Sequence, residues 1–204
     1  MRYPKEKKER SLGERLQLKG ERCRSPKCAM VRKPYRPGMH GHKRQRKMLS
    51  DFGRQIKEKQ KFKWSYGIDE RNLRHIFERA ERKSGSVASQ FLKLLELRLD
   101  NVIFRLGFAA SRSMARQLVN HGHVMVNGRR VKSPGFELKL GDIISVRPSS
   151  VTKSVFKNLK EELSKYTPPA WLSIDADKFE GKIVSAPDEN MPFEVNLLVE
   201  SFSK

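Results

Sequence analysis

The chain has 204 residues, enough for one or two modest domains. It carries 44 lysines and arginines against 23 aspartates and glutamates, and this formal charge of +21 predicts a polyanionic partner, a nucleic acid or a membrane surface. No apolar run is long enough to span a bilayer, and the polar N-terminus MRYPKEKKERSLGERL resembles neither a secretory signal nor a transit peptide. We therefore expect a cytoplasmic protein that binds a polyanion.

Residues 1–48 are basic, are interrupted by prolines and show no sustained periodicity. The stretch PYRPGMHGHKRQRK (34–47) places proline and glycine ahead of a cationic run, which predicts an extended basic arm. The alternative is a disordered tail, although Leu12, Leu16 and Leu18 indicate some local packing.

Helical patterns begin near residue 50. Ser50 or Asp51 can cap the first helix and Asp69 the second, while Ser111 can cap the fourth. The third is the most apolar, and Gly107 fits its C-terminal end. The expected helices cover residues 50–65, 69–83, 87–107 and 111–122.

The periodicity then changes to that of strands. In VMVNGRRV (124–131), Asn127-Gly128 predicts a tight hairpin, and IISV (143–146) predicts a further strand. A helix is expected over 152–166, because prolines 168 and 169 cannot continue it. The tail holds candidate strands around 171–174 and 182–185 and ends in the apolar NLLVESF.

The helix over 111–122 has two distinct faces. Its packing side contains Met114, Ala115, Leu118 and Val119, whereas Arg112, Arg116 and Asn120 recur every four residues on another side. Like charges at this spacing cost helix stability, and an external anion would offset that cost by bonding to the guanidinium forks. Because the hairpin that follows is also basic, we expect one cationic surface; the alternative is a solvated basic helix.

Residues 98–146 are similar to the small RNA-binding module named after small-subunit ribosomal protein four. The segments LKGERCRSPKCAM, PYRPGMHGHKR, SDFGRQIKEKQKFKWSYGI and FEVNLLVESFS resemble other parts of the bacterial members of that family. The resemblance implies an α+β fold, with a helical N-terminal domain, an extended basic arm and a helix-helix-bent-sheet module before the C-terminal tail. The implied domains are an arm over 1–48, a helical domain over 49–94 completed by 180–204, and the RNA-binding module with its extension over 95–179.

The resemblance also places the RNA-facing residues, with no catalytic residue, cofactor or small-molecule substrate implied. The implied RNA contacts are Arg112, Ser113, Arg116, Gln117, His121, His123, Asn127, Arg129 and Lys132 in the module, and Tyr35, Arg36, His40, Lys43, Arg44, Arg46 and Lys47 in the arm. Glycines required by turns are Gly38, Gly41, Gly122 and Gly128.

The function implied is that of a structural protein of the cytoplasmic ribosome that binds small-subunit ribosomal RNA (rRNA). It would nucleate assembly, support translational accuracy and messenger RNA entry, contact ribosomal protein five and the messenger RNA, and repress its own message. Three alternatives remain: an RNA-modifying enzyme that carries the same module, a non-ribosomal RNA binder, and a DNA-binding winged helix. The short tail and the lack of catalytic motifs argue against the enzyme, and the flanking segments argue against the DNA binder.

The only two cysteines lie in ERCRSPKC (21–28). Many members of the resembled family bind structural zinc with four N-terminal cysteines, but here the earlier pair of positions holds Glu6 and Glu9. Because structural zinc sites are built mostly from cysteine and histidine, we expect no metal. A site completed by His40 and His42 is the alternative, and a disulfide is not expected in a reducing cytosol.

Overall fold

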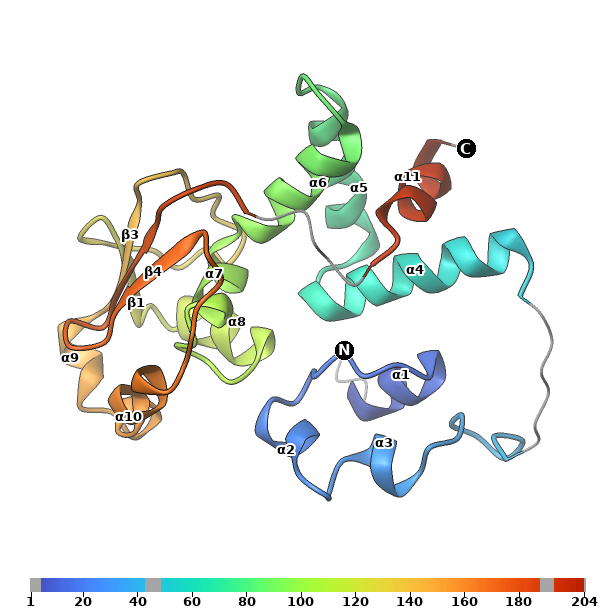
Figure 1. Cartoon of the computed structure of the whole chain (residues 1–204), viewed down its shortest axis with the longest axis horizontal. Coiled ribbons are helices and arrows are strands. Elements are labelled where there is room, and N and C mark those ends of the chain that lie inside the picture. Colours follow the sequence, from blue (N-terminus) through green and yellow to red (C-terminus); the bar gives the residue numbers. More distant parts are fainter. Residues whose placement is uncertain (1–4, 43–48, 188–192, 204) are drawn as a thin grey trace. The chain divides into compact units, whose positions relative to one another are not determined.

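The computed structural model describes residues 5–42, 49–187 and 193–203 (Figure 1). These residues form two compact units, the first from residues 5–42, 49–91 and 193–203 and the second from residues 92–187. The first is helical and the second holds a sheet with helices, so the α+β class is confirmed. Within the described ranges, no helix is both long and apolar enough to cross a membrane.

Capping side chains set the helix starts of the first unit. Ser50 Oγ accepts from Gly53 N (3.2 Å) ahead of α4, and Asp69 Oδ1 accepts from Asn72 N (2.8 Å) ahead of α5, as the sequence predicts. The helices are α1 (Lys5–Leu12), α2 (Glu21–Arg24), α3 (Ala29–Arg32), α4 (Asp51–Tyr66), α5 (Glu70–Glu81), the start of α6 (Val87–Glu96) and the C-terminal α11 (Val195–Ser203).

The core of this unit is aromatic. Phe62 and Phe91 are fully buried with ring centroids 5.9 Å apart, and Phe77 lies 4.9 Å from Phe202 of α11. Helix α11 thus packs against α4 and α5. Residues 180–183, which were expected in the same domain, instead form a strand of the second unit.

The N-terminal residues differ from the expected extended arm, because residues 5–32 contain three short helices. Arg10 of α1 donates from Nε to the carbonyl oxygens of Lys33 (2.9 Å) and Tyr35 (3.0 Å). Glu14 forms ion pairs of 2.8 Å with Lys57 and Lys61 of α4. These long-range contacts fold the segment back onto itself and onto α4, which local sequence periodicity does not reveal.

An antiparallel sheet forms the centre of the second unit, with strand order β2-β1-β3-β5-β4. Its strands are β1 (Val124–Val126), β2 (Arg129–Arg130), β3 (Ile143–Val146), β4 (Leu172–Asp175) and β5 (Glu180–Ile183). The helices α7 (Leu99–Arg105) and α8 (Arg112–Asn120) lie beside the sheet (Figure 1). They pack on it through a buried apolar cluster that includes Ile103, Leu118 and Ile144. The predicted hairpin and the strand at 143–146 are confirmed.

The single helix expected over 87–107 is wrong, since the chain breaks between α6 and α7. Arg98 has an extended backbone (φ −69°, ψ 137°) and bridges Glu137. Leu99 N donates to Phe136 O, and Leu138 N donates to Leu97 O, both at 2.9 Å. This strand-like pairing with a distant segment overrides the local helical preference.

The helix expected over 152–166 is also divided. The structure has α9 (Pro148–Val151), a 3-10 turn η1 (Ser154–Phe156) and α10 (Leu159–Ser164). The division lets Phe156, Leu159 and Leu163 all enter the core of the second unit.

Candidate nucleic-acid interface

Helix α8 has one buried and one solvent-facing side. Ser111 Oγ caps it by accepting from Met114 N at 3.3 Å, and Ala115, Leu118 and Val119 are buried. The other side carries the predicted RNA contacts: Ser113 and Gln117 are exposed, and Arg112 and Arg116 are half-buried. The two faces follow the spacing seen in the sequence.

The end of α8 is a tight turn around Gly122. This residue has φ +69°, its N–H donates to Val119 O (2.8 Å), and the next N–H, that of His123, reaches Leu118 O (3.0 Å). Such bonds satisfy the last carbonyls of the helix and favour glycine at the left-handed position. The turn requirement predicted for Gly122 is therefore visible in the backbone.

Arg130 of β2 joins this helix end to the hairpin. Its Nε donates to Gly122 O at 3.1 Å, and its second guanidinium nitrogen donates to His121 O at 3.0 Å. A Cβ placed on Gly122 would lie 2.1 Å from the Arg130 Nε. Helix end and hairpin thus form one connected surface, on which Arg129 and Lys132 are exposed.

Asn127 and Gly128 make the hairpin turn with φ of +49° and +76°. Both ends of the Asn127 side-chain amide form hydrogen bonds within the fold: Nδ2 donates to Asp142 (2.8 Å) and Oδ1 accepts from Ile143 N (2.9 Å). Its contact with RNA stays a prediction, while its part in holding the turn is evident.

Two histidines flank the Gly122 turn, with ring centroids 5.9 Å apart. His121 is exposed, whereas His123 is half-buried and its Nδ1 lies 2.9 Å from the hydroxyl of buried Ser150. Burial, and then the nearby charges of Lys153, His121, Arg130 and Arg147, lower the pKa of His123 below its usual 6.5. His123 is therefore neutral at pH 7 in the free protein.

Sequence reasoning missed the cations Arg147 and Lys153 at this corner. Arg147 N donates to His123 O (2.8 Å), and Lys153 N donates to the backbone of Ser150 (3.0 Å), so both lie beside His123. Their proximity follows from the register of β1 with β3, which pairs Val124 with Val146. Only correct strand pairing could have predicted it.

In the first unit, the expected arm contacts that the structure describes lie in an irregular segment. Arg36 and His40 are exposed, while the Tyr35 ring lies 4.8 Å from the Arg10 guanidinium and 3.6 Å from the His42 ring. The predicted contacts Lys43, Arg44, Arg46 and Lys47 fall outside the described residues.

Both glycines predicted to serve a turn in this segment meet a backbone constraint. Gly38 has φ +108° and accepts from Gly41 N at 3.1 Å. A Cβ on Gly41 would lie 1.8 Å from Arg36 O, so only glycine fits there.

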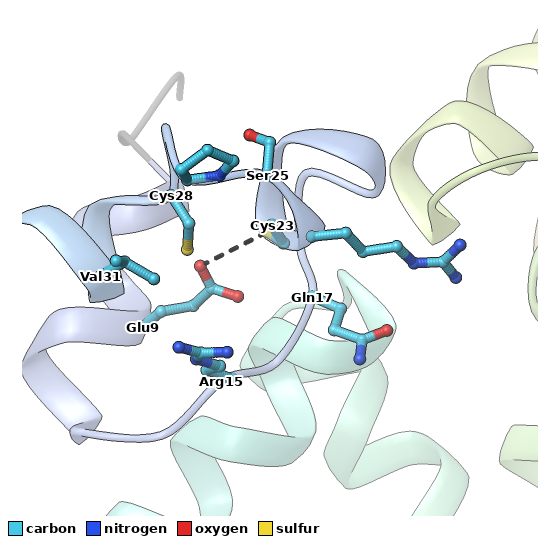
Figure 2. A pocket seen from close by; sticks show the side chains of 9 residues that line it. Glu9, Arg15, Gln17, Cys23, Ser25, Cys28 and Val31 are labelled. Carbon is cyan, nitrogen blue, oxygen red and sulfur yellow. Dashed lines mark hydrogen bonds between the residues drawn. The ribbon is translucent and has the colours of Figure 1, made fainter.

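The cysteine stretch surrounds a buried carboxylate (Figure 2). Glu9 is 1% exposed, and its Oε1 accepts from Leu16 N and Leu18 N, both at 3.1 Å. The Cys23 thiol donates to Glu9 Oε2 at 4.0 Å, and Cys28 is buried beside them in the lining of the same cavity of about 290 Å³. Burial is the main reason that the pKa of Cys23 is raised.

These residues do not fit the four-ligand zinc site of the resembled family. Glu9 is occupied by two backbone N–H groups, and Glu6 pairs with Arg22 at 2.6 Å and with Lys19 at 3.5 Å. Among the residues that the structure describes, no group of three or more histidines, cysteines or acids could hold a metal ion. The carboxylate of Glu9 organises this loop by hydrogen bonds.

The lysines of α4 are paired with glutamates of the same unit. Lys57 and Lys61 pair with Glu14, and Lys59 and Lys63 pair with Glu70 at 2.6 and 2.7 Å. These pairs lower the pKa of both glutamates against the opposing effect of burial. Much of the positive charge of α4 is thus balanced within the fold.

Comparison with known proteins agrees with the resemblance. Residues 1–96 match the family model described as ribosomal protein S4/S9 N-terminal domain, and residues 97–144 match the S4 domain. The small ribosomal subunit protein uS4 of Syntrophomonas wolfei is 48% identical over 195 residues, which cover 94% of this chain and 93% of the relative. The uS4 proteins of Caldicellulosiruptor bescii and Thermus thermophilus are 47% identical over the same shares. Because two family models cover residues 1–144 and the identity to these relatives extends over 94% of the chain, the protein belongs to the uS4 family of small ribosomal subunit proteins.

Proposed function

We propose that the protein binds small-subunit rRNA directly, as a structural component of the cytoplasmic ribosome, and catalyses no reaction. In the second unit the RNA would lie on the solvent-facing side of α8, the turn at Gly122 and the β1–β2 hairpin. The observation that carries this proposal is the pair of hydrogen bonds from Arg130 to the end of α8, which joins helix and hairpin into one donor-rich surface.

The composition of this surface suits folded RNA. A-form RNA is recognised through its shape, phosphates and 2′-hydroxyls, because its base edges lie in a deep and narrow groove. The surface offers guanidinium, hydroxyl, amide and imidazole groups, from Arg116, Ser113, Gln117 and His121 among others. Aromatic residues make up only 8% of the chain, which fits this mode better than stacking on single strands.

The arm segment would make a second, separate contact with rRNA. Arg36 and His40 are exposed there, next to the positions of Lys43, Arg44, Arg46 and Lys47. From the family we further propose that the protein nucleates assembly, supports translational accuracy, contacts ribosomal protein five, lies near the messenger RNA at its entry, and represses its own message.

Sedimentation tests the ribosomal role. The tagged protein is expressed in bacterial cells, and a lysate at moderate salt is separated on a sucrose gradient. We expect the wild type to co-migrate with small subunits, and the double variant Arg129→Ala/Lys132→Ala to shift toward free protein. Lys160→Ala is the matched control, since it removes an exposed lysine paired with Asp177 (2.7 Å) in the same unit. Wild-type protein found mainly free would refute the ribosomal role.

A further inference from the structure

The first residues of α7 lie directly under α8. Asp100 and Asn101 are 3% and 1% exposed, although one is charged and the other polar. Buried polar side chains persist when their hydrogen bonds are satisfied. Asn101 accepts a hydrogen bond from Arg112 of α8, whereas the hydrogen bonds of Asp100 come from Arg98. The start of α7 can therefore influence how an arginine of α8 is oriented.

The orientation of the Asn101 amide is fixed by Glu96. Asn101 Nδ2 donates to Glu96 Oε2 (2.9 Å) and to Glu96 O (3.0 Å), which leaves Oδ1 directed the other way. There it accepts from Arg112 Nε at 2.7 Å, a short bond to a charged donor.

The negative charge of Glu96 is neutralised by an ion pair with Arg105. The Glu96 carboxylate is 1% exposed and receives Arg105 Nε at 3.0 Å and a second Arg105 nitrogen at 3.1 Å. The ion pair between Glu96 and Arg105 therefore fixes the Asn101 amide, and the amide oxygen of Asn101 in turn accepts the hydrogen bond from Arg112 of α8.

The aromatic ring of Phe104 also contacts Arg112. Its guanidinium lies over Phe104 of α7, with 4.6 Å between the Cζ and the ring centroid. The hydrogen bond to Asn101 and the contact with the Phe104 ring both restrict the orientation of this guanidinium. Asp100 binds Arg98 at 3.1 and 2.9 Å and forms a longer ion pair, of 4.0 Å, with Arg116.

We propose that Asn101 is a positioning residue for RNA binding: it holds the Arg112 guanidinium in the orientation that RNA requires. The proposal rests on the proposed function, in which Arg112 lies on the RNA-facing surface. Ordering one long side chain on binding costs roughly three- to tenfold in affinity, and a preoriented arginine avoids much of that cost.

A double-mutant cycle tests the proposal, with the full chain and a small-subunit rRNA fragment in a filter-binding assay. We expect Arg112→Ala to weaken binding about tenfold and Asn101→Ala about three- to tenfold. If Asn101 acts through Arg112, the double variant binds within about twofold of Arg112→Ala alone. Leu163→Ala is the control: it removes a buried side chain of α10 in the same unit, lowers the unfolding temperature, and leaves RNA affinity unchanged.

Each outcome separates the two claims. If Arg112→Ala weakens binding and Asn101→Ala does not, or if their effects multiply in the double variant, the positioning role is wrong and the RNA surface stands. If Arg112→Ala itself leaves affinity unchanged, the RNA-facing role of Arg112 fails, and the positioning proposal fails with it. Should Asn101→Ala not fold, Phe104→Leu removes the ring contact instead, and its loss of affinity should likewise vanish in the Arg112→Ala background.

Discussion

Replacing Gly122 with alanine perturbs the corner where α8 meets the hairpin. Alanine at φ +69° is strained by about 1–2 kcal/mol relative to ordinary backbone conformations. The new Cβ would also lie 2.1 Å from the Arg130 Nε, so the guanidinium must move away from the carbonyl oxygens of His121 and Gly122. The two hydrogen bonds, one part-buried and one exposed, contribute about 0.5–1 kcal/mol each. With the backbone strain, we expect a total destabilisation of about 2–4 kcal/mol.

Gly128→Ala is the matched control for this prediction. Gly128 has a similar φ of +76°, but a Cβ there meets nothing within 4 Å. Urea unfolding followed by circular dichroism should therefore show a loss of about 1–2 kcal/mol for Gly128→Ala, from strain alone. The difference between the two variants measures the contribution of Arg130.

The cycle is completed by Arg130→Ala in both backgrounds. Without the guanidinium, Gly122→Ala should cost no more than Gly128→Ala. If Gly122→Ala is no more destabilising than Gly128→Ala in the presence of Arg130, then Arg130 does not join the helix end to the hairpin as described.

Three further predictions concern other parts of the fold. The His123 imidazole should titrate below 6.5 in an NMR pH series. Because the unfolded state then takes up its proton first, the stability due to this group should be constant above about pH 6.5 and fall as the pH drops through its folded pKa; a midpoint above 6.5 contradicts this environment. Glu9→Ala should lower the free energy of unfolding by about 3 kcal/mol, because it leaves Leu16 N and Leu18 N without an acceptor. Glu9→Gln keeps an oxygen there and should lower it less. Elemental analysis that finds one zinc per chain would contradict the metal-free arrangement. Gly181→Ala should destabilise the fold by about 1–3 kcal/mol, since its Cβ would lie 2.5 Å from the side chain of buried Leu106. In a chain that also carries Leu106→Ala, most of this added cost should disappear. Fully additive effects in the double variant would argue against the close packing.

Features encoded by neighbouring residues could be predicted from the sequence. Ser50, Asp69 and Ser111 cap the helices that follow them, and Asn127-Gly128 forms the hairpin turn, because these signals depend on groups within three residues. The faces of α8 follow the same logic, since helical spacing alone separates Leu118 from Gln117.

Features that depend on distant partners could not be predicted in this way. The chain breaks at Arg98 because it bridges Glu137, and the arm folds back because Arg10 reaches the backbone of Lys33 and Tyr35. The fixed amide of Asn101 was missed as well, since its partners Glu96 and Arg112 lie five and eleven residues away. Family resemblance predicted which residues face RNA. Only the three-dimensional contacts show how Arg112 is oriented and how α8 is joined to the hairpin.

The salt dependence of rRNA binding tests the central claim most directly. Binding of the purified protein to a small-subunit rRNA fragment would be measured between 50 and 400 mM potassium chloride, for the wild type and for Arg129→Ala. If roughly 6–10 phosphates are neutralised, the wild-type affinity should fall by several orders of magnitude, and the variant should show a log–log slope shallower by about 1. A nearly flat wild-type plot, or an unchanged slope in the variant, would contradict the phosphate-binding surface proposed for α8 and its hairpin.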